Sequence, residues 1–237
     1  MKNLQGIISR SVNNASMQLE RLGTVANTSS NYLTDGYKSV RFENFLQEDG
    51  RINGVERVDY RQGSISSTGR ELDMAINGTG FIPVTTPNGQ IAYTRNCSFK
   101  TNEEGLLVMA DGSVVGEGIK IPAATTQVFI KPDGRVLAAD ENNLQGNEVG
   151  KIQLVKFNNY EGLQLIDNNK VVATKESGEP VLITEHKQFT QGCVERSNVN
   201  IRDSINDILR LNASLVSSTR IIKFTDEIYQ KAINLTQ

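Results

Sequence analysis

Apolar residues recur every three or four positions over the N-terminal part of the chain. These residues are Leu4, Ile8, Val12, Ala15, Leu19, Leu22 and Ala26. Polar residues such as Asn13, Asn14 and Glu20 stand between them, so the spacing predicts a helix with one apolar stripe. Gly6 and Gly23 each weaken such a helix by roughly 1 kcal/mol relative to alanine. We therefore expect this helix to need a partner.

A second stripe runs through the C-terminal residues at a spacing of seven. Its main row is Ile201, Ile208, Leu215, Ile222 and Tyr229, with Ile205 and Ile233 on the intervening row. Asn212, Thr219 and Asp226 complete the intervening row, so this row is mixed, unlike that of a self-sufficient leucine zipper. Asn200 and Asp203 are typical of a helix start, because they satisfy free amides and suit the helix dipole.

Between the two stripes, short apolar runs are separated by turn dipeptides. The dipeptides are Asn77-Gly78, Asn88-Gly89, Asp111-Gly112 and Asp133-Gly134. They supply the positive φ angles of tight hairpin turns, and we expect strands on both sides of the last three. Further strands are predicted at Ile152–Phe157, Val171–Ala173 and Val181–Ile183. The middle of the chain therefore reads as a hairpin-rich, all-β domain.

The predicted fold class is α+β, with long terminal helices forming a coiled-coil-like assembly region and a central all-β domain. We expect residues 1–38 to hold the N-terminal helix, 39–70 an extended connector, 71–190 the β domain and 191–237 the C-terminal helix. Neither stripe can be buried locally, and pairing of the helices with each other and with neighbouring copies would produce a polymer. Both stripes are thus candidate self-assembly residues. A helix that lies on a membrane surface, or one that packs in an intramolecular bundle, would show the same apolar stripe in its sequence.

Composition narrows the function classes. Among 237 residues, 38% are hydrophobic and 22% are charged, as in a globular protein. The 25 basic and 27 acidic residues give a net charge of -2, and no basic stripe points to nucleic acid. We find neither an 18-residue apolar run nor the apolar stretch of a secretory signal after Met1, which alone suggests a cytoplasmic protein. Cys97 and Cys193 suit two buried free thiols better than a metal site, although a disulfide stays open.

Candidate catalytic chemistry is weak. Gly78-Thr79-Gly80 lacks the third glycine and following helix of a phosphate loop, so we interpret it as a turn. His186 and Cys193 are the residue types of a base and a nucleophile, but this is the single histidine and no orienting partner is evident. We predict structural roles for both.

Paired carboxylates are the remaining candidate. Glu71 with Asp73, or Asp140 with Glu141, could serve a glycosidase only if a cleft held them several ångströms apart. We interpret them as surface acids. The sequence therefore predicts no catalytic, cofactor-binding or metal-ligating residues.

Several segments resemble signatures of the flagellar rod and hook protein family. The N-terminal signature is matched at Ala26, Asn27, Asn31, Thr34, Gly36, Tyr37 and Lys38. Residues 62–65 and 68–81, which include Gly80 and Phe81, resemble the central block of that family. The segment before the last helix is similar at Gly192, Ser197, Asn198, Val199 and Asn200. The chain departs from the family pattern at Thr28, Ser29, Ser30 and Leu33.

The resemblance implies a non-enzymatic subunit of the flagellar basal-body rod, which transmits torque as a drive shaft. It implies copies of itself and other rod or hook proteins as partners, with no cofactor, nucleic acid or membrane insertion. It further implies export through the flagellar type III apparatus, without a cleavable signal peptide, to the periplasm-spanning rod. A short connector after Phe45-Leu46 and a small β domain favour the proximal rod, with the distal rod as the alternative. A cell-wall-acting enzyme or a binding module on the β domain is the alternative from another class.

Overall fold

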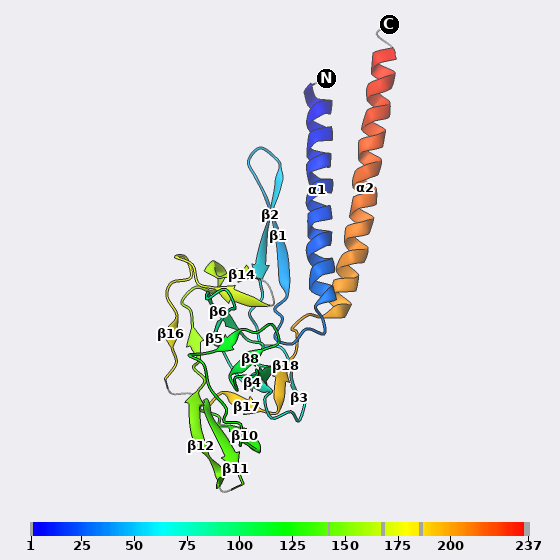
Figure 1. Ribbon diagram of the computed structural model, residues 1–237. Helices are drawn as coiled ribbons and strands as arrows, with labels where there is room; N and C mark the ends of the chain where they lie inside the picture. Colours follow the sequence, from blue (N-terminus) through cyan, green and yellow to red (C-terminus); the bar gives the residue numbers. More distant parts are fainter. Residues whose placement is uncertain (1, 142, 167–168, 185–186, 235–237) are drawn as a thin grey trace. The chain divides into compact units, whose positions relative to one another are not determined.

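The computed structural model describes residues 2–141, 143–166, 169–184 and 187–234. The chain divides into two compact units. The helical unit comprises residues 1–32, 39–59 and 199–237, and the β unit comprises residues 33–38 and 60–198. Figure 1 labels the elements of both. The predicted α+β class is confirmed: one helix near each end of the chain and a β-rich middle.

Two long helices dominate the helical unit. They are α1 (Lys2–Ser30) and α2 (Ile201–Asn234). The helices lie side by side and run antiparallel (Figure 1). The side chain of Asn200 accepts a hydrogen bond from the amide of Arg202 at 3.1 Å, as a helix N-cap does. The predicted start of the C-terminal helix is therefore confirmed.

A β hairpin completes the helical unit, within the segment that we expected to be an extended connector. Its strands are β1 (Val40–Leu46) and β2 (Ile52–Val58), which pair antiparallel. The Asp49-Gly50 dipeptide lies in the turn between them. The hairpin packs on α1, where the side-chain amide of Asn13 accepts from the Ile52 amide (2.8 Å) and donates to its carbonyl (3.1 Å). This packing orders a segment that has little apolar core of its own.

The β unit consists of short strands. Their bounds are β3 (Ile65–Ser67), β4 (Met74–Ile76), β5 (Ile82–Thr85), β6 (Ile91–Thr94), β7 (Phe99–Thr101), β8 (Leu107–Met109), β9 (Val114–Val115), β10 (Gln127–Ile130), β11 (Arg135–Asp140), β12 (Asn143–Lys151), β13 (Val155–Lys156), β14 (Gln164–Ile166), β15 (Lys170–Val172), β16 (Val181–Leu182), β17 (Phe189–Gln191) and β18 (Cys193–Glu195). A 3₁₀ turn spans Tyr160–Gly162.

In the described residues, the largest sheet has the strand order β14-β15-β6-β5-β9-β8-β7. A second sheet has the order β10-β11-β12, and β13-β16, β17-β4 and β18-β3 form separate antiparallel pairs. The last two pairs join residues shortly before α2 to residues early in the β unit. The unit is therefore closed by the segment that leads into the C-terminal helix.

The predicted hairpins at Asn88-Gly89, Asp111-Gly112 and Asp133-Gly134 are confirmed, since they connect β5 to β6, β8 to β9 and β10 to β11. The strand predicted at Ile152–Phe157 is shorter, because only Val155 and Lys156 pair. We did not predict β12, whose residues are mostly polar and include two glycines. Backbone pairing with β11 forms this edge strand without an apolar pattern.

Two clusters of buried side chains form the core of the β unit. The larger is aliphatic and sulfur-rich, and includes Met74, Ile82, Leu107, Val136 and Ile152. The smaller is aromatic, with Phe81 and Phe157 at a centroid distance of 6.1 Å. Across the described residues, neither helix is apolar enough over its length to cross a membrane.

Candidate assembly surface and signature junction

The contact between α1 and α2 has a polar seam. The most buried residues of α2 recur at a spacing of seven: Ser204, Leu211, Ser218 and Thr225. Across the seam, the Gln18 amide donates to the hydroxyl of Ser214 (2.7 Å) and the Asn14 amide donates to that of Ser218 (3.4 Å). These hydrogen bonds fix the antiparallel register. The helices pack, and the seam leaves much of their apolar surface outside it.

The candidate self-assembly residues flank this seam. Half-buried members are Ile8, Ala15, Leu22, Ile208, Leu215, Ile222 and Tyr229. Exposed members are Val12, Leu19, Ala26, Ile201 and Ile205. The side chain of Leu4, like that of Ile233, lies outside the described residues. The role of all these candidate self-assembly residues in binding a neighbouring copy stays a prediction.

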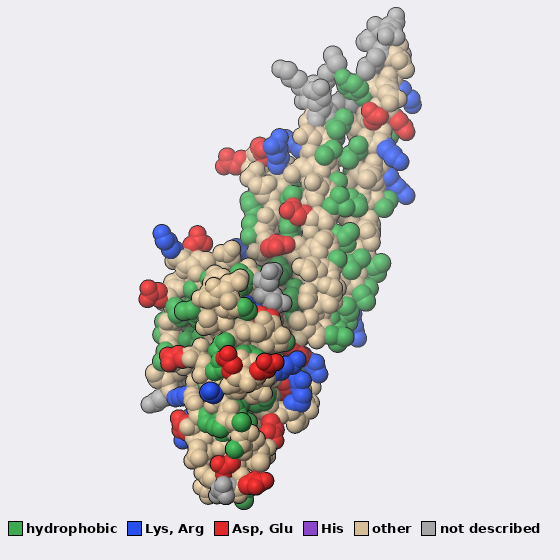
Figure 2. Space-filling model, in the orientation of Figure 1, with side chains coloured by type: hydrophobic (Ala, Val, Ile, Leu, Met, Phe, Trp, Pro, Cys, Tyr) green, Lys and Arg blue, Asp and Glu red, His purple; other side chains and the backbone are tan. Residues whose placement is uncertain are grey.

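Several exposed apolar residues were missing from the sequence prediction. They are Ile7, Leu209, Val216, Ile221, Phe224 and Ile228. Leu209 is 62% exposed and Phe224 is 64% exposed, which is high for side chains of this size. Figure 2 shows hydrophobic side chains gathered along the visible face of the two helices. A contiguous apolar surface of this kind is typical of an interaction site.

In the β unit, side chains that lie far apart in the sequence meet at one carboxylate. Glu195, which is fully buried, accepts from Lys38 Nζ at 2.6 Å and from Arg95 Nε at 2.9 Å. The side chains of Lys38 and Arg95 are only 5% and 4% exposed. The amide of Gly63 also donates to Glu195, at 2.9 Å. We call this cluster of Lys38, Arg95 and Glu195 the signature junction.

Two glycines of the signature pack against the junction. Gly36 has a φ of +70° and donates its amide to the Glu195 carbonyl at 2.7 Å. A Cβ at this position would lie 2.8 Å from the Asn96 nitrogen. Gly80 has a φ of +128°, and its carbonyl accepts from Arg95 at 2.7 Å. A Cβ at Gly80 would lie 2.9 Å from Leu154 Cγ, so both positions require glycine for conformation and for space.

Other signature residues support the same region. The amide of Asn198 donates to the Tyr37 carbonyl (3.4 Å), and the Tyr37 amide donates to the carbonyl of Thr34 (3.3 Å). Ser197 is buried, and Gly192 adopts a φ of +71°. The structure therefore brings together the signature segment from Thr34 to Lys38 and the segment from Glu195 to Asn198, whereas Gly192 donates to the Asp73 carbonyl.

The helical signature residues lie elsewhere, in α1 and around its end. Ala26 and Asn27 are exposed, and the Asn31 amide donates to the Asn27 carbonyl at 3.0 Å. Thr28, where the chain departs from the family pattern, is buried and its hydroxyl donates to the Val40 carbonyl at 3.4 Å. This departure ties α1 to the hairpin of the helical unit. Val199 is buried just before the cap residue Asn200.

Comparison with known proteins identifies the family. Residues 75–138 match the family model described as "Flagellar hook protein FlgE/F/G D1 domain". The flagellar basal-body rod protein FlgG of Caulobacter vibrioides is 30% identical over 223 residues, which cover 92% of this chain and 81% of the relative. This chain belongs to the flagellar basal-body rod protein family. It is a structural subunit of the flagellar rod.

Two more relatives agree with this assignment of the rod subunit. The rod protein FlgG of Bacillus subtilis is 31% identical, over 78% of this chain and 73% of the relative. The rod protein FlgF of Mesorhizobium japonicum is 28% identical, over 92% and 93%. None of these names states a proximal or distal position, so the proximal placement stays a prediction.

The cysteines, histidine and carboxylates that we considered as candidate catalytic residues can now be located in the structure. Cys97 and Cys193 are free thiols, as predicted, but Cys193 is half-buried rather than buried. Burial raises the pKa of the Cys97 thiol, which disfavours the reactive thiolate. His186 lies outside the described residues. The described residues contain no group of three His, Cys, Asp or Glu side chains placed to hold a metal ion.

The interpretation of Asp73 as a surface acid is wrong, because its side chain is only 1% exposed. Burial tends to raise its pKa, but hydrogen bonds from Arg70, Thr68 and Ser98 outweigh this and lower the pKa. Glu71, its proposed partner, accepts from the Val128 amide at 3.1 Å. Both carboxylates thus hold the β unit together.

Sequence reasoning missed Arg95 and Glu195 as key residues. Their sequence separation of 100 hides their contact. No local signal marked this contact: successive side chains of a strand point to opposite faces, so an apolar Val194 does not predict that Glu195 is buried.

Proposed function

We propose that the subunit self-assembles into the rod through the exposed apolar surface of α1 and α2. The observation that carries this proposal is the set of large apolar side chains exposed on both helices of a family whose members are rod proteins. Burial of such a side chain contributes roughly 1.5–3 kcal/mol. The contact is repeated in every copy, so a few residues suffice to stabilise a long polymer.

The partners that fit this proposal are copies of the same chain and other rod or hook proteins. The place of action is the flagellar basal body, in the part of the rod that spans the periplasm, and the route is the flagellar type III export apparatus. The role is mechanical: interlocked helices transmit torque along the shaft. The buried or hydrogen-bonded state of Cys97, Asp73 and Glu71 supports a subunit that is not an enzyme.

The proximal rod is the position that we favour from the short connector, and the distal rod is the alternative. Deleting the neighbouring rod proteins and following incorporation of this subunit distinguishes the proximal from the distal position. A proximal subunit is incorporated before the outer part of the rod forms, whereas a distal subunit requires the proximal part to be present.

The test is Leu209→Asp, with Arg210→Glu as the matched control. Leu209 is exposed before assembly, so the substitution leaves the folded monomer intact but places an unpaired carboxylate in the polymer contact. Arg210 is also exposed and lies about 100° around the same helix. We expect the Leu209 variant to be made and exported but absent from rods, with loss of motility. The control should be incorporated, because exposed charges usually contribute less than 1 kcal/mol.

Leu19→Asp tests the other helix in the same way, because Leu19 is 54% exposed on α1. Normal rods from both the Leu19 and the Leu209 variants would refute assembly through this surface. Circular dichroism of each purified variant checks that the monomer is folded.

A further inference from the structure

A cleft in the β unit lies beside the outer edge of strand β7. Its volume is about 580 Å³, and its walls include residues 101–105, which end β7 and turn toward β8, and residues 120–128. A smaller hollow of about 340 Å³ adjoins it and shares Glu71, Leu72 and Thr101 with it. We call the cleft and the hollow together the β7 groove. The groove follows the outermost strand of the seven-stranded sheet.

The backbone of β7 directs polar groups into this groove. In an antiparallel pair, alternate residues direct their amide and carbonyl to the same side. The amide of Leu107, which lies opposite Thr101, donates away from β7 to the Ile119 carbonyl at 2.9 Å. Thr101 and Leu107 therefore form a non-hydrogen-bonded pair, and the amide and carbonyl of Thr101 point outward. Thr101 is exposed, so an incoming strand can reach both groups.

A neighbouring segment of the chain pairs with the outer edge of β7 but stops short of Thr101. The Phe99 amide donates outward to the Leu72 carbonyl at 3.1 Å. Residues 71–72 form a turn rather than a strand, so regular pairing along this edge ends there. The fold thus begins strand pairing on this edge and leaves it incomplete. An incomplete edge of this kind is where an extended peptide adds a strand.

The opposite wall of the groove is closed by side chains. Glu71 Oε2 accepts from the Val128 amide at 3.1 Å, and the side-chain amide of Gln191 donates to the Val128 carbonyl at 2.7 Å. The Ile130 amide donates to Gln191 Oε1 at 3.0 Å. These bonds satisfy the outer edge of β10, so an incoming strand has its backbone partners on β7 and not on β10.

Charge at the larger cleft favours a basic partner. Glu71, Glu103 and Glu104 line this cleft and are exposed, and Lys120 is the one cation among its lining residues, all of which lie in the described ranges. The excess of negative charge attracts cationic side chains and disfavours nucleic acid and acidic peptides.

The smaller hollow is balanced in charge. Arg70 donates to Asp73 from Nη2 at 2.7 Å, so these two charges match. Lys100 and Glu71 are the other charged residues that line the hollow. A bound peptide therefore gains most when its basic side chains lie in the larger cleft.

We propose that the β7 groove binds an extended, basic peptide segment of a partner protein, which adds a strand to β7 at Thr101. Main-chain hydrogen bonds to Thr101 supply affinity, and contacts with Glu103 and Glu104 supply specificity for basic side chains. Leu72 and Ile121 contribute apolar surface for the alternate side chains of the peptide. The site lies in the β unit, so it is independent of the proposed assembly through the helices.

Fluorescence anisotropy with the full chain tests the binding. The probe is a peptide that alternates lysine and valine and is about eight residues long, within the usual range for a strand. It should bind, and a peptide with glutamate in place of lysine should bind at least about tenfold more weakly. Equal binding of the two peptides, or no binding of the lysine peptide at about 1 mM, would overturn the proposal.

Methylated probes test strand addition without any change to the protein. One probe carries N-methyl groups on its lysine amides and the other on its valine amides, so each blocks one edge of the extended peptide. Only one edge pairs with β7, so the affinities of the two probes should differ by at least about tenfold. Equal affinities would refute strand addition.

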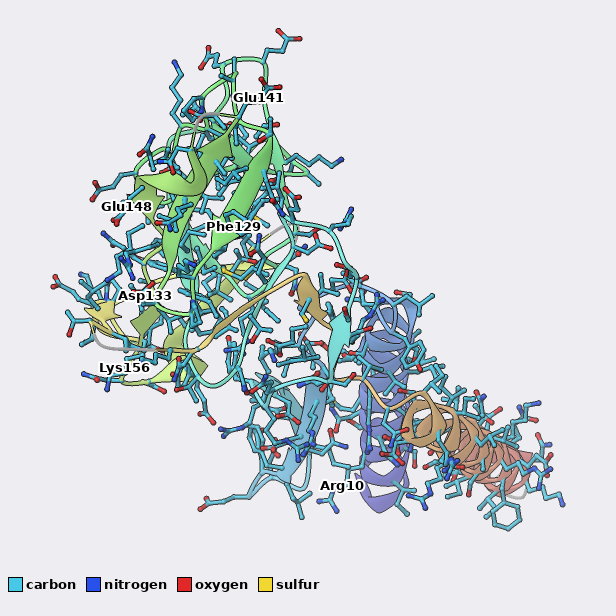
Figure 3. All side chains as sticks on the ribbon, turned by 90° about the horizontal axis from the view of Figure 1, so that it is seen from below. Arg10, Phe129, Asp133, Glu141, Glu148 and Lys156 are labelled. Carbon is cyan, nitrogen blue, oxygen red and sulfur yellow. The ribbon has the colours of Figure 1, made fainter. Side chains whose placement is uncertain are left out.

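Matched variants locate the bound peptide. Glu103→Gln combined with Glu104→Gln should weaken binding of the lysine peptide by about threefold or more. Glu141→Gln combined with Glu148→Gln removes the same charge from exposed positions of the β11–β12 hairpin, outside the groove (Figure 3), and should leave the affinity unchanged. Equal losses in the two double variants would show that only general surface charge attracts the peptide, which would overturn the proposed site.

The backbone contact at Thr101 is tested last. Thr101→Pro removes the outward amide at an edge position, where proline is tolerated, and should weaken binding by about fivefold through the loss of one hydrogen bond. Circular dichroism checks that this variant is folded. In the unsubstituted chain, the peptide should slow hydrogen exchange of the Thr101 amide. An amide that exchanges equally fast with and without the peptide would contradict pairing with β7, whatever the fold of the variant.

Discussion

Replacing Glu195 by glutamine should destabilise the β unit more than any comparable change at an exposed carboxylate. The substitution keeps the shape of the side chain but removes the negative charge that Lys38 and Arg95 share. Neither cation can reach water easily, since their side chains are 5% and 4% exposed. Two buried cations would then face each other's field without a counter-charge.

The size of the effect follows from burial. Removal of one partner from a buried ion pair costs about 3–5 kcal/mol, because the remaining charge stays desolvated. The single amide oxygen of glutamine can still accept from one of the two cations, which sets the expected loss near the lower end of that range. For a protein of this length, each kcal/mol shifts the melting temperature by about 2–4 °C. We therefore expect the melting temperature of the β unit to fall by roughly 6–12 °C.

Thermal unfolding followed by circular dichroism measures this shift, with Glu148→Gln as the matched control. Glu148 lies on β12 (Figure 3), is half exposed and is 3.9 Å from Arg135. Loss of such an exposed pair should change stability by less than about 1 kcal/mol. A Glu195→Gln variant that melts within about 2 °C of the unsubstituted chain would refute the role of the junction.

Two further predictions concern the β unit. The pKa of Asp73 is lowered, so its hydrogen-bonded carboxylate stabilises the fold above the unfolded pKa of about 3.9, and this stabilisation is lost as the pH falls through the folded pKa. When the free energy of unfolding is measured with urea at a series of acidic pH values, it should therefore depend less on pH for Asp73→Asn than for the unsubstituted chain. Equal pH dependence of the two proteins would contradict this. In the native protein, a thiol reagent should modify the half-buried Cys193 and spare Cys97 until urea unfolds the chain, as mass spectrometry can check; early modification of Cys97 would show that its burial is transient.

The sequence alone determined the class of the fold and the family. Seven-residue spacing from Ile201 to Tyr229, and the spacing of three and four from Leu4 to Ala26, predict helices because a helix repeats every 3.6 residues. Dipeptides such as Asn88-Gly89 predict hairpins because their backbone angles are local properties. The family signature is also local in sequence, so it could be matched without coordinates.

Tertiary structure decided which of these residues meet. The sequence suggested that the apolar rows would pair the helices, yet a hydrogen bond between Gln18 and Ser214 also joins them. Leu209 and Phe224, which belong to neither predicted row, are large apolar residues that the structure leaves exposed. The signature junction joins Lys38 and Glu195 across 157 positions, a separation that no periodic pattern encodes. Strand β12 forms without an apolar pattern, because backbone pairing with β11 holds it in place. Periodicity reports which side of an element is apolar, whereas the partner on that side depends on the packing of the whole chain.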